Sequence, residues 1–169
     1  MKTGIKIVTL CIFLSFGFVA QAAHITVFNT VMTGDQANAG QGTGSTGKGA
    51  ATMTLDSDTG LFSWFVAWEN LVGDVTVAHF HGPATPDQNG GVQVVIDPSS
   101  NPTSGSMVLT ADQIDDLLQG LWYINIHSTE NPGGEIRGQV LALTPVPLPG
   151  AVWLFSGALI GLARIVRKG

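Results

Sequence analysis

Cysteine is almost absent from this chain, since Cys11 is the only one among 169 residues. It lies in an apolar segment near the N-terminus that we expect to be removed during export. The mature form would then carry no thiol, which excludes disulfide bonds, thiolate metal sites and a cysteine nucleophile. Any chemistry of the mature form has to come from other side chains.

Basic residues are also scarce, with 7 Lys and Arg against 12 Asp and Glu. Five of the basic residues lie in the two end segments, so only Lys48 and Arg137 lie between them. All 12 acidic residues lie from Asp35 to Glu135, which makes the formal charge of the central part about −10. This charge argues against nucleic acid and anionic lipid as partners. It is typical of a soluble exported protein that can attract cations.

The N-terminal segment has the three parts of a secretory signal peptide. Lys2 and Lys6 form a positive start, residues 7–20 are apolar, and Ala20-Gln21-Ala22 matches the small-x-small cleavage pattern. We therefore expect a signal peptide over residues 1–22. The alternative is an uncleaved N-terminal anchor.

The C-terminal segment, residues 145–169, combines a proline motif, an apolar run and a basic end. Residues 151–163 carry no charge. Before this run stand Val146, Pro147, Leu148 and Pro149, and after it stand Arg164, Arg167 and Lys168. Prolines favour a helix start, and a basic end should stay at the cytoplasmic face. The order resembles the PEP-CTERM class of bacterial sorting signals in its VPLPA-type variant, with Gly150 in place of the usual alanine.

This resemblance implies a route for the protein. In that class the tail includes a transmembrane segment and holds an exported protein at the inner membrane. A membrane protease of the exosortase type then removes the tail, and the proteins accompany exopolysaccharide and biofilm production. The resemblance therefore implies delivery to the cell surface or the extracellular matrix. An ordinary C-terminal membrane anchor is the alternative.

The central part, residues 23–144, has the pattern of a small all-β domain. Short runs rich in β-branched and aromatic residues alternate with turn signals. The expected strands cover residues 24–31, 51–56, 61–68, 74–81, 92–96, 107–109, 121–127 and 135–143. One short helix is expected between Thr110, with Gln113 three residues later as a capping box, and Gly120. Ile114, Leu117 and Leu118 give this helix one apolar face. The pattern predicts a Greek-key β-sandwich or barrel with one short helix, flanked by two hydrophobic targeting segments.

Three segments of the central part carry a family resemblance. They are AHFHGPA at residues 78–84, the helix start LTADQI at residues 109–114, and YINIHSTENPGGEIRGQV at residues 123–140. Together they resemble the CHRD domain, which is widespread in bacterial exported proteins. The resemblance implies an extracytoplasmic β-sandwich without a settled activity. It favours a binding or structural module at the cell surface, with exopolysaccharide or matrix proteins as candidate partners.

Histidine is the candidate metal ligand. His79 and His81 stand two apart on an expected strand, so both imidazoles share a face, with Cα atoms about 6.5–7 Å apart. His127 ends another strand, just before a turn. Neutral imidazole suits copper or another divalent transition metal, so these three residues are predicted to form a metal site. Two alternatives stay open: the histidines donate to backbone carbonyls and hold the neighbouring turns, or the metal serves a redox enzyme such as a superoxide dismutase.

The remaining candidates have structural and functional interpretations. His24, at the start of the mature chain, is either a copper ligand together with the terminal amine or a solvent-facing strand residue. Trp64 and Trp68 share a face, so they either belong to the core or stack on sugar rings. Arg137 is expected to form a structural pair with Glu135, Glu69 or Asp74, and a catalytic role is the alternative.

Overall fold

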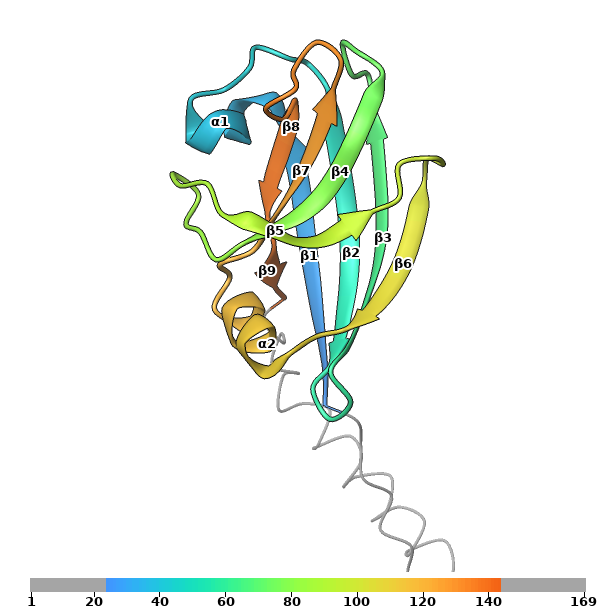
Figure 1. Ribbon diagram of the computed structural model, residues 1–169, viewed down its shortest axis with the longest axis vertical. Helices are drawn as coiled ribbons and strands as arrows, with labels where there is room; N and C mark the ends of the chain where they lie inside the picture. Colours follow the sequence, from blue (N-terminus) through green and yellow to red (C-terminus); the bar gives the residue numbers. More distant parts are fainter. Residues whose placement is uncertain (1–23, 144–169) are drawn as a thin grey trace, which may run out of the picture.

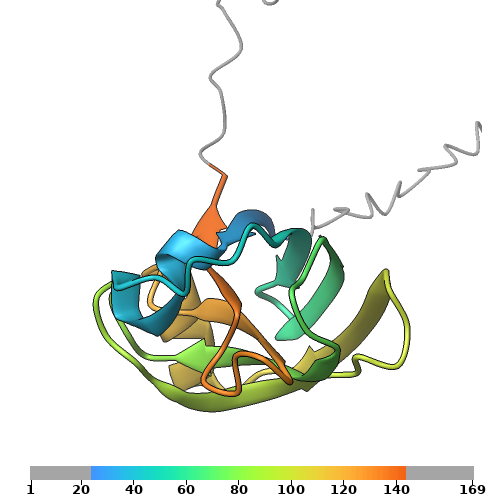
Figure 2. The ribbon, with the colours of Figure 1, turned by 90° about the horizontal axis from the view of Figure 1, so that it is seen from above.

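The computed structural model describes residues 24–143, which form one antiparallel sheet curled into a nearly closed barrel (Figures 1 and 2). The strands are β1 (Ile25–Thr33), β2 (Lys48–Asp56), β3 (Leu61–Glu69), β4 (Val75–Gly82), β5 (Gly91–Ile96), β6 (Thr103–Val108), β7 (Tyr123–Ser128), β8 (Ile136–Gln139) and β9 (Leu141–Ala142). The predicted all-β class and most of the predicted strands are confirmed.

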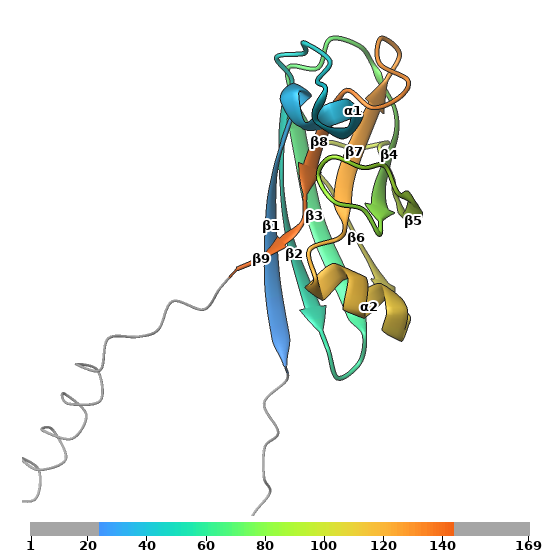
Figure 3. The same cartoon turned by 90° about the vertical axis from the view of Figure 1, so that its left-hand side faces the viewer.

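The strand order is β5-β4-β7-β8-β1-β2-β3-β6, and β9 pairs with β1. β5 and β6 are the two edges, and they approach each other at the seam of the barrel. Figure 3 shows β1, β2 and β3 on one side and β4, β5 and β7 on the other. After β6 the chain returns to β7, which pairs with β4. The strands β4, β5, β6 and β7 would complete a Greek key only if β5 paired with β6, and no ladder joins these two edges within residues 24–143, so the Greek-key order stays a prediction.

The hairpin between β2 and β3 is the most regular local structure. Asp56 pairs with Leu61, and the strands stay in register up to Lys48 and Glu69. In the turn, the Asp56 carboxylate accepts the backbone N–H of Asp58 at 3.0 Å, and Gly60 has a φ of 71°. A short polar side chain and a glycine are what such an Asx turn needs.

The core consists of inward side chains at alternate strand positions. In β3, Phe62 and Trp64 are buried, whereas Phe65 between them is 52% exposed. The ring of Phe62 meets Phe80 at a centroid distance of 5.2 Å and Trp122 at 5.9 Å, both edge to face. Aromatic rings bury the largest apolar areas, so this cluster dominates the hydrophobic stabilisation of the barrel. Trp64 belongs to the core and is not available for sugar stacking.

The predicted helix is α2 (Ala111–Leu118), which covers one end of the barrel (Figure 1). Its capping box is present: the Thr110 hydroxyl accepts the Gln113 amide N–H, and the Gln113 side chain accepts the Thr110 N–H at 3.0 Å. Leu117 is fully buried, and Gly120 follows the helix with a φ of 73°. Leu118 is 44% exposed. Leu118 lies about 100° around the helix from Leu117, at the margin of the predicted apolar face.

The predicted last strand, residues 135–143, is interrupted. β8 pairs with β7, and β9 pairs with β1, so the chain changes its partner between them. Val140 lies at the change: its side chain is fully buried, and its N–H donates to the carbonyl of Trp122 at 2.8 Å. One continuous strand could not pair in both places.

The segment between β1 and β2 is a loop, as expected. It contains a 3-10 turn (Gly34–Gln36) and the four-residue α1 (Ala37–Gly40). Asn38 and Ala39 have positive φ values of 51° and 55°, so α1 is a turn and not a continuous helix.

Two predicted segments lie outside the described residues: the signal peptide, residues 1–22, and the tail, residues 145–169. Between residues 24 and 143, no helix is long and apolar enough to cross a membrane.

Candidate functional site

His79, His81 and His127 lie together on the outer face of the barrel, where β4 pairs with β7. In the ladder His79 stands opposite Asn125, and His81 opposite Tyr123. Side chains alternate between the faces of a strand, so these residues point away from the core. One ligand nitrogen of each histidine lies within 4.8 Å of those of the other two.

The three rings are close to metal-binding geometry. Ring centroids are 5.4 Å apart for His79–His81, 5.4 Å for His79–His127 and 6.1 Å for His81–His127. Three nitrogens at about 2.0–2.1 Å from one tetrahedral ion would be about 3.4 Å apart. The three rings would have to move closer together to bind one ion in this way.

Backbone carbonyls orient two of the rings. The Nδ1 atom of His81 lies 3.0 Å from the Gly90 carbonyl oxygen, and Nδ1 of His127 lies 2.8 Å from that of Pro132. A carbonyl only accepts, so each Nδ1 carries the hydrogen and each Nε2 keeps its lone pair. These bonds hold the two turns, as the structural alternative expected. They are also the bonds that commonly orient metal-binding histidines, so the two interpretations are compatible.

Two nitrogens of the cluster have no partner. Nδ1 of His79 and Nε2 of His81 are buried, and neither atom forms a hydrogen bond within residues 24–143. A buried polar atom without a partner costs about 1–3 kcal/mol. Burial lowers the pKa of the His79 and His81 side chains. The neighbouring imidazoles lower these pKa values further, but by less than burial does. Burial of His79 and His81 therefore favours the neutral form of these two rings, which is the form that binds a metal.

Asn125 lies at the centre of the cluster and was missed from the sequence. Its Nδ2 is 3.3 Å from Nε2 of His127 and donates to the Gly133 carbonyl at 3.2 Å, whereas its Oδ1 is buried without a partner. A Cβ atom at Gly134 would overlap the Asn125 amide, and Gly134 has a φ of 118°. The sequence signal was the spacing of Asn125 and His127, two apart on one strand face.

Tyr123 and Arg137 support the cluster from the side. The His81 ring stacks on Tyr123 with a centroid distance of 5.0 Å and an interplanar angle of 7°. The Arg137 guanidinium lies 3.5 Å from the centroid of the Tyr123 ring. Arg137 donates to the carbonyls of Gln88 at 2.8 Å and Thr85 at 3.1 Å. It therefore anchors the loop that also presents Gly90 to His81.

The predicted ion pair of Arg137 with a carboxylate is wrong. No carboxylate lies in salt-bridge distance of Arg137 within residues 24–143. Glu135 is buried elsewhere, accepting the Ser45 hydroxyl at 2.6 Å and the Val72 N–H at 2.6 Å. Glu135 precedes β8, which begins at Ile136, and its carboxylate contacts Ser45 and Val72 instead of Arg137.

His24 does not join the cluster. Its side chain is 73% exposed and its Nδ1 lies 3.0 Å from the Asp58 carboxylate, in the β2–β3 turn. That turn is at the opposite end of the barrel from the β7–β8 loop (Figure 1). The structure agrees with a solvent-facing strand residue, and the role of the terminal amine stays a prediction because it involves residues before 24.

A family comparison covers the whole site. The family model of the CHRD domain matches residues 28–140. The chain belongs to the CHRD domain family. Neither a curated protein nor a solved structure matches the chain. CHRD domains are typical of exported proteins, so this one is an extracellular or periplasmic β-domain. The sorting signal that the tail resembles stays a prediction.

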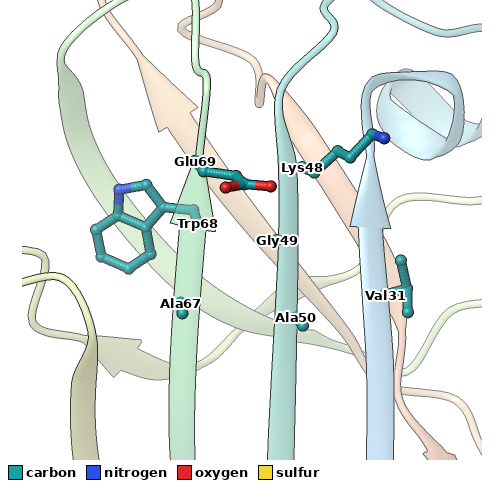
Figure 4. A pocket seen from close by; sticks show the side chains of 7 residues that line it. All are labelled: Val31, Lys48, Gly49, Ala50, Ala67, Trp68 and Glu69. Carbon is teal, nitrogen blue, oxygen red and sulfur yellow. The ribbon is translucent and has the colours of Figure 1, made fainter.

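A second feature is a shallow groove of about 310 Å³ on the outside of β1, β2 and β3. Gly49, Ala50 and Ala67 form part of its lining, together with Val31, Lys48, Trp68 and Glu69 (Figure 4). Figure 4 shows the Glu69 carboxylate directed toward β2 and the indole of Trp68 beside β3. Trp68 is partly buried and packs against the core, on the same face of β3 as Trp64.

Proposed function

We propose that this exported CHRD domain binds a divalent transition metal ion, copper in the first place, through His79, His81 and His127. The observation that carries the proposal is the convergence of three imidazoles whose ligand nitrogens lie within 4.8 Å, two of them with buried, unpartnered nitrogens. A bound cation would satisfy these atoms, which no protein group does between residues 24 and 143.

The donor set favours copper among the divalent ions. All three donors are neutral imidazoles, and imidazole suits copper, zinc, nickel and iron. Among first-row divalent ions, affinity for a given site generally peaks at copper. The expected absence of a thiol from the mature form excludes thiolate-bound alternatives. Nδ1 of His79 and Nε2 of His81 are donors without a hydrogen-bond partner, and Nε2 of His127 contacts the Asn125 amide, which a metal ion would displace.

The test is the copper content and copper(II) affinity of the purified protein and of a His79→Ala/His81→Ala double variant. His24→Ala is the matched control, because it removes a histidine that lies outside the cluster. We expect one copper per chain in the wild type and in the control, and none in the double variant with the same circular dichroism spectrum. Equal copper binding by a folded double variant would refute the proposal.

A second candidate function is binding of a polysaccharide in the groove of β1–β3, in line with delivery to an exopolysaccharide matrix. Gly49, Ala50 and Ala67 give the groove a floor of small residues, and Lys48 and Glu69 offer polar groups at one end, which suits a sugar ring. Lys48→Ala/Glu69→Ala removes the polar groups at the end of the groove and should abolish retention on immobilised exopolysaccharide. Phe65→Ala, which removes an exposed aromatic ring outside the groove lining, is the control and should not. Equal retention of both variants would exclude this groove.

The proposed route to the surface involves the predicted tail. Processing of residues 145–169 by an exosortase-type protease at the inner membrane would release the domain. The intact mass of the surface form tests this: a chain that still contains the basic end would indicate an anchor instead.

A further inference from the structure

The histidine cluster offers fewer donors than a divalent ion takes. Between residues 24 and 143, no carboxylate or thiol lies close enough to His79, His81 and His127 to be a further ligand of the same ion. Zinc and copper ions bind at least four donors in most protein sites, and three-histidine sites complete the set with water or another exogenous ligand. A metal bound here would therefore keep at least one position for a ligand from solution.

The charge around this position favours an anion. Imidazoles bind a metal ion in their neutral form, so three of them would leave the charge of a divalent ion uncompensated. The nearest basic group is Arg137, whose charge acts on His81 and whose guanidinium lies over the neighbouring Tyr123 ring. Asp87 is the carboxylate that acts on Arg137, and it is exposed to solvent. The loaded site would thus be a local positive centre in an otherwise acidic domain, and an anion would neutralise it.

Asn125 is placed to hold such a ligand. The side chain is 8% exposed, and its Oδ1 has no partner. Its Nδ2 now points to Nε2 of His127 at 3.3 Å. A metal ion would take the lone pair of that nitrogen, so the N–H of Asn125 would become free to donate to an atom bound to the metal. The Oδ1 atom could accept a hydrogen from a bound water.

We infer that the metal at His79, His81 and His127 has an exchangeable coordination position for water and small anions, and that Asn125 is the positioning residue that hydrogen-bonds the bound ligand. This inference rests on the proposed metal site and makes that site a reactive one instead of a purely structural one. Azide is a suitable probe, because it binds copper(II) as a small monoanion.

The experiment is a titration of the copper-loaded, purified protein with sodium azide, followed by absorption and electron paramagnetic resonance. We expect an azide-to-copper charge-transfer band and a changed copper spectrum, both saturating at one azide per copper. If copper binds at the histidines and azide changes neither spectrum, the inference is wrong while the metal site stands. If the His79→Ala/His81→Ala variant binds copper as the wild type does, the proposed function fails first.

Variants of Asn125 test its role separately. In Asn125→Ala the azide dissociation constant should rise about tenfold, which corresponds to one lost hydrogen bond, while copper stoichiometry is kept. Asn125→Asp should raise the affinity for copper and lower the affinity for azide, because an added carboxylate binds the cation and repels the anion. A purely structural role would lower both affinities together. Unchanged azide binding in both variants would remove Asn125 from the proposal, and the wild-type titration stands if a variant does not fold.

Discussion

Arg137 holds the loop over the histidine cluster, and its replacement by methionine should destabilise the domain strongly. The side chain is 2% exposed and has no carboxylate partner within residues 24–143. It donates instead to the carbonyls of Gln88 and Thr85 and lies over the Tyr123 ring. Arg137→Met keeps most of the volume and removes every donor.

The magnitude follows from these contacts. A hydrogen bond to a charged group contributes about 1.5–3 kcal/mol, so the two carbonyl bonds amount to about 3–6 kcal/mol. The contact with the aromatic ring adds about 0.5–2 kcal/mol. Burying the Arg137 cation costs the wild type several kcal/mol. The variant avoids this cost, so part of the lost stability is offset. The carbonyls left behind can reach water only if the loop opens, so we expect a net loss of about 3 kcal/mol in the free energy of unfolding.

Urea unfolding and thermal unfolding of the metal-free protein measure this loss. A decrease of about 3 kcal/mol corresponds to a fall in Tm of about 10 °C for a domain of this size. Lys48→Met is the matched control, because Lys48 is exposed, and it should change the stability by less than about 0.5 kcal/mol. Arg137→Lys should fall between the two. If Arg137→Met were as stable as the wild type, the desolvation cost would cancel the hydrogen bonds, and the assigned anchoring role would be refuted.

Three further predictions concern stability. Burial alone would raise the pKa of Glu135, but hydrogen bonds from Ser128, Ser45 and backbone N–H groups outweigh it and hold the pKa below its usual value. The ionised Glu135 side chain therefore stabilises the fold above about pH 4.3, and this contribution is lost as the pH falls through the lowered pKa. Glu135→Gln should make the stability depend less on pH in that acid range. Trp122→Ala should cost about 3–5 kcal/mol in urea unfolding, since the ring is fully buried among aromatic side chains. Gly134→Ala should cost about 1–3 kcal/mol, because its φ is 118° and a Cβ would meet the Asn125 amide; a variant as stable as the wild type would contradict this.

Local signals in the sequence were sufficient for much of the fold. The β2–β3 hairpin follows from alternating apolar residues around Asp56 and Gly60, and α2 follows from the Thr110–Gln113 capping box. These signals act between residues a few positions apart, so no knowledge of the rest of the chain is needed. The placement of His79 and His81 on one face has the same origin, the two-residue period of a strand.

Only the tertiary structure decided what surrounds those two histidines. His127 joins them because β7 pairs with β4 across more than forty residues of chain, in a register that sets Val77 opposite His127. A shift by one residue would have turned His127 toward the core, and no local pattern specifies that register. The buried carbonyl partners of Arg137 and the central place of Asn125 depend on loops that the same pairing brings together. Sequence alone therefore determined the candidate ligands, and the long-range pairing of strands decided that they form one site.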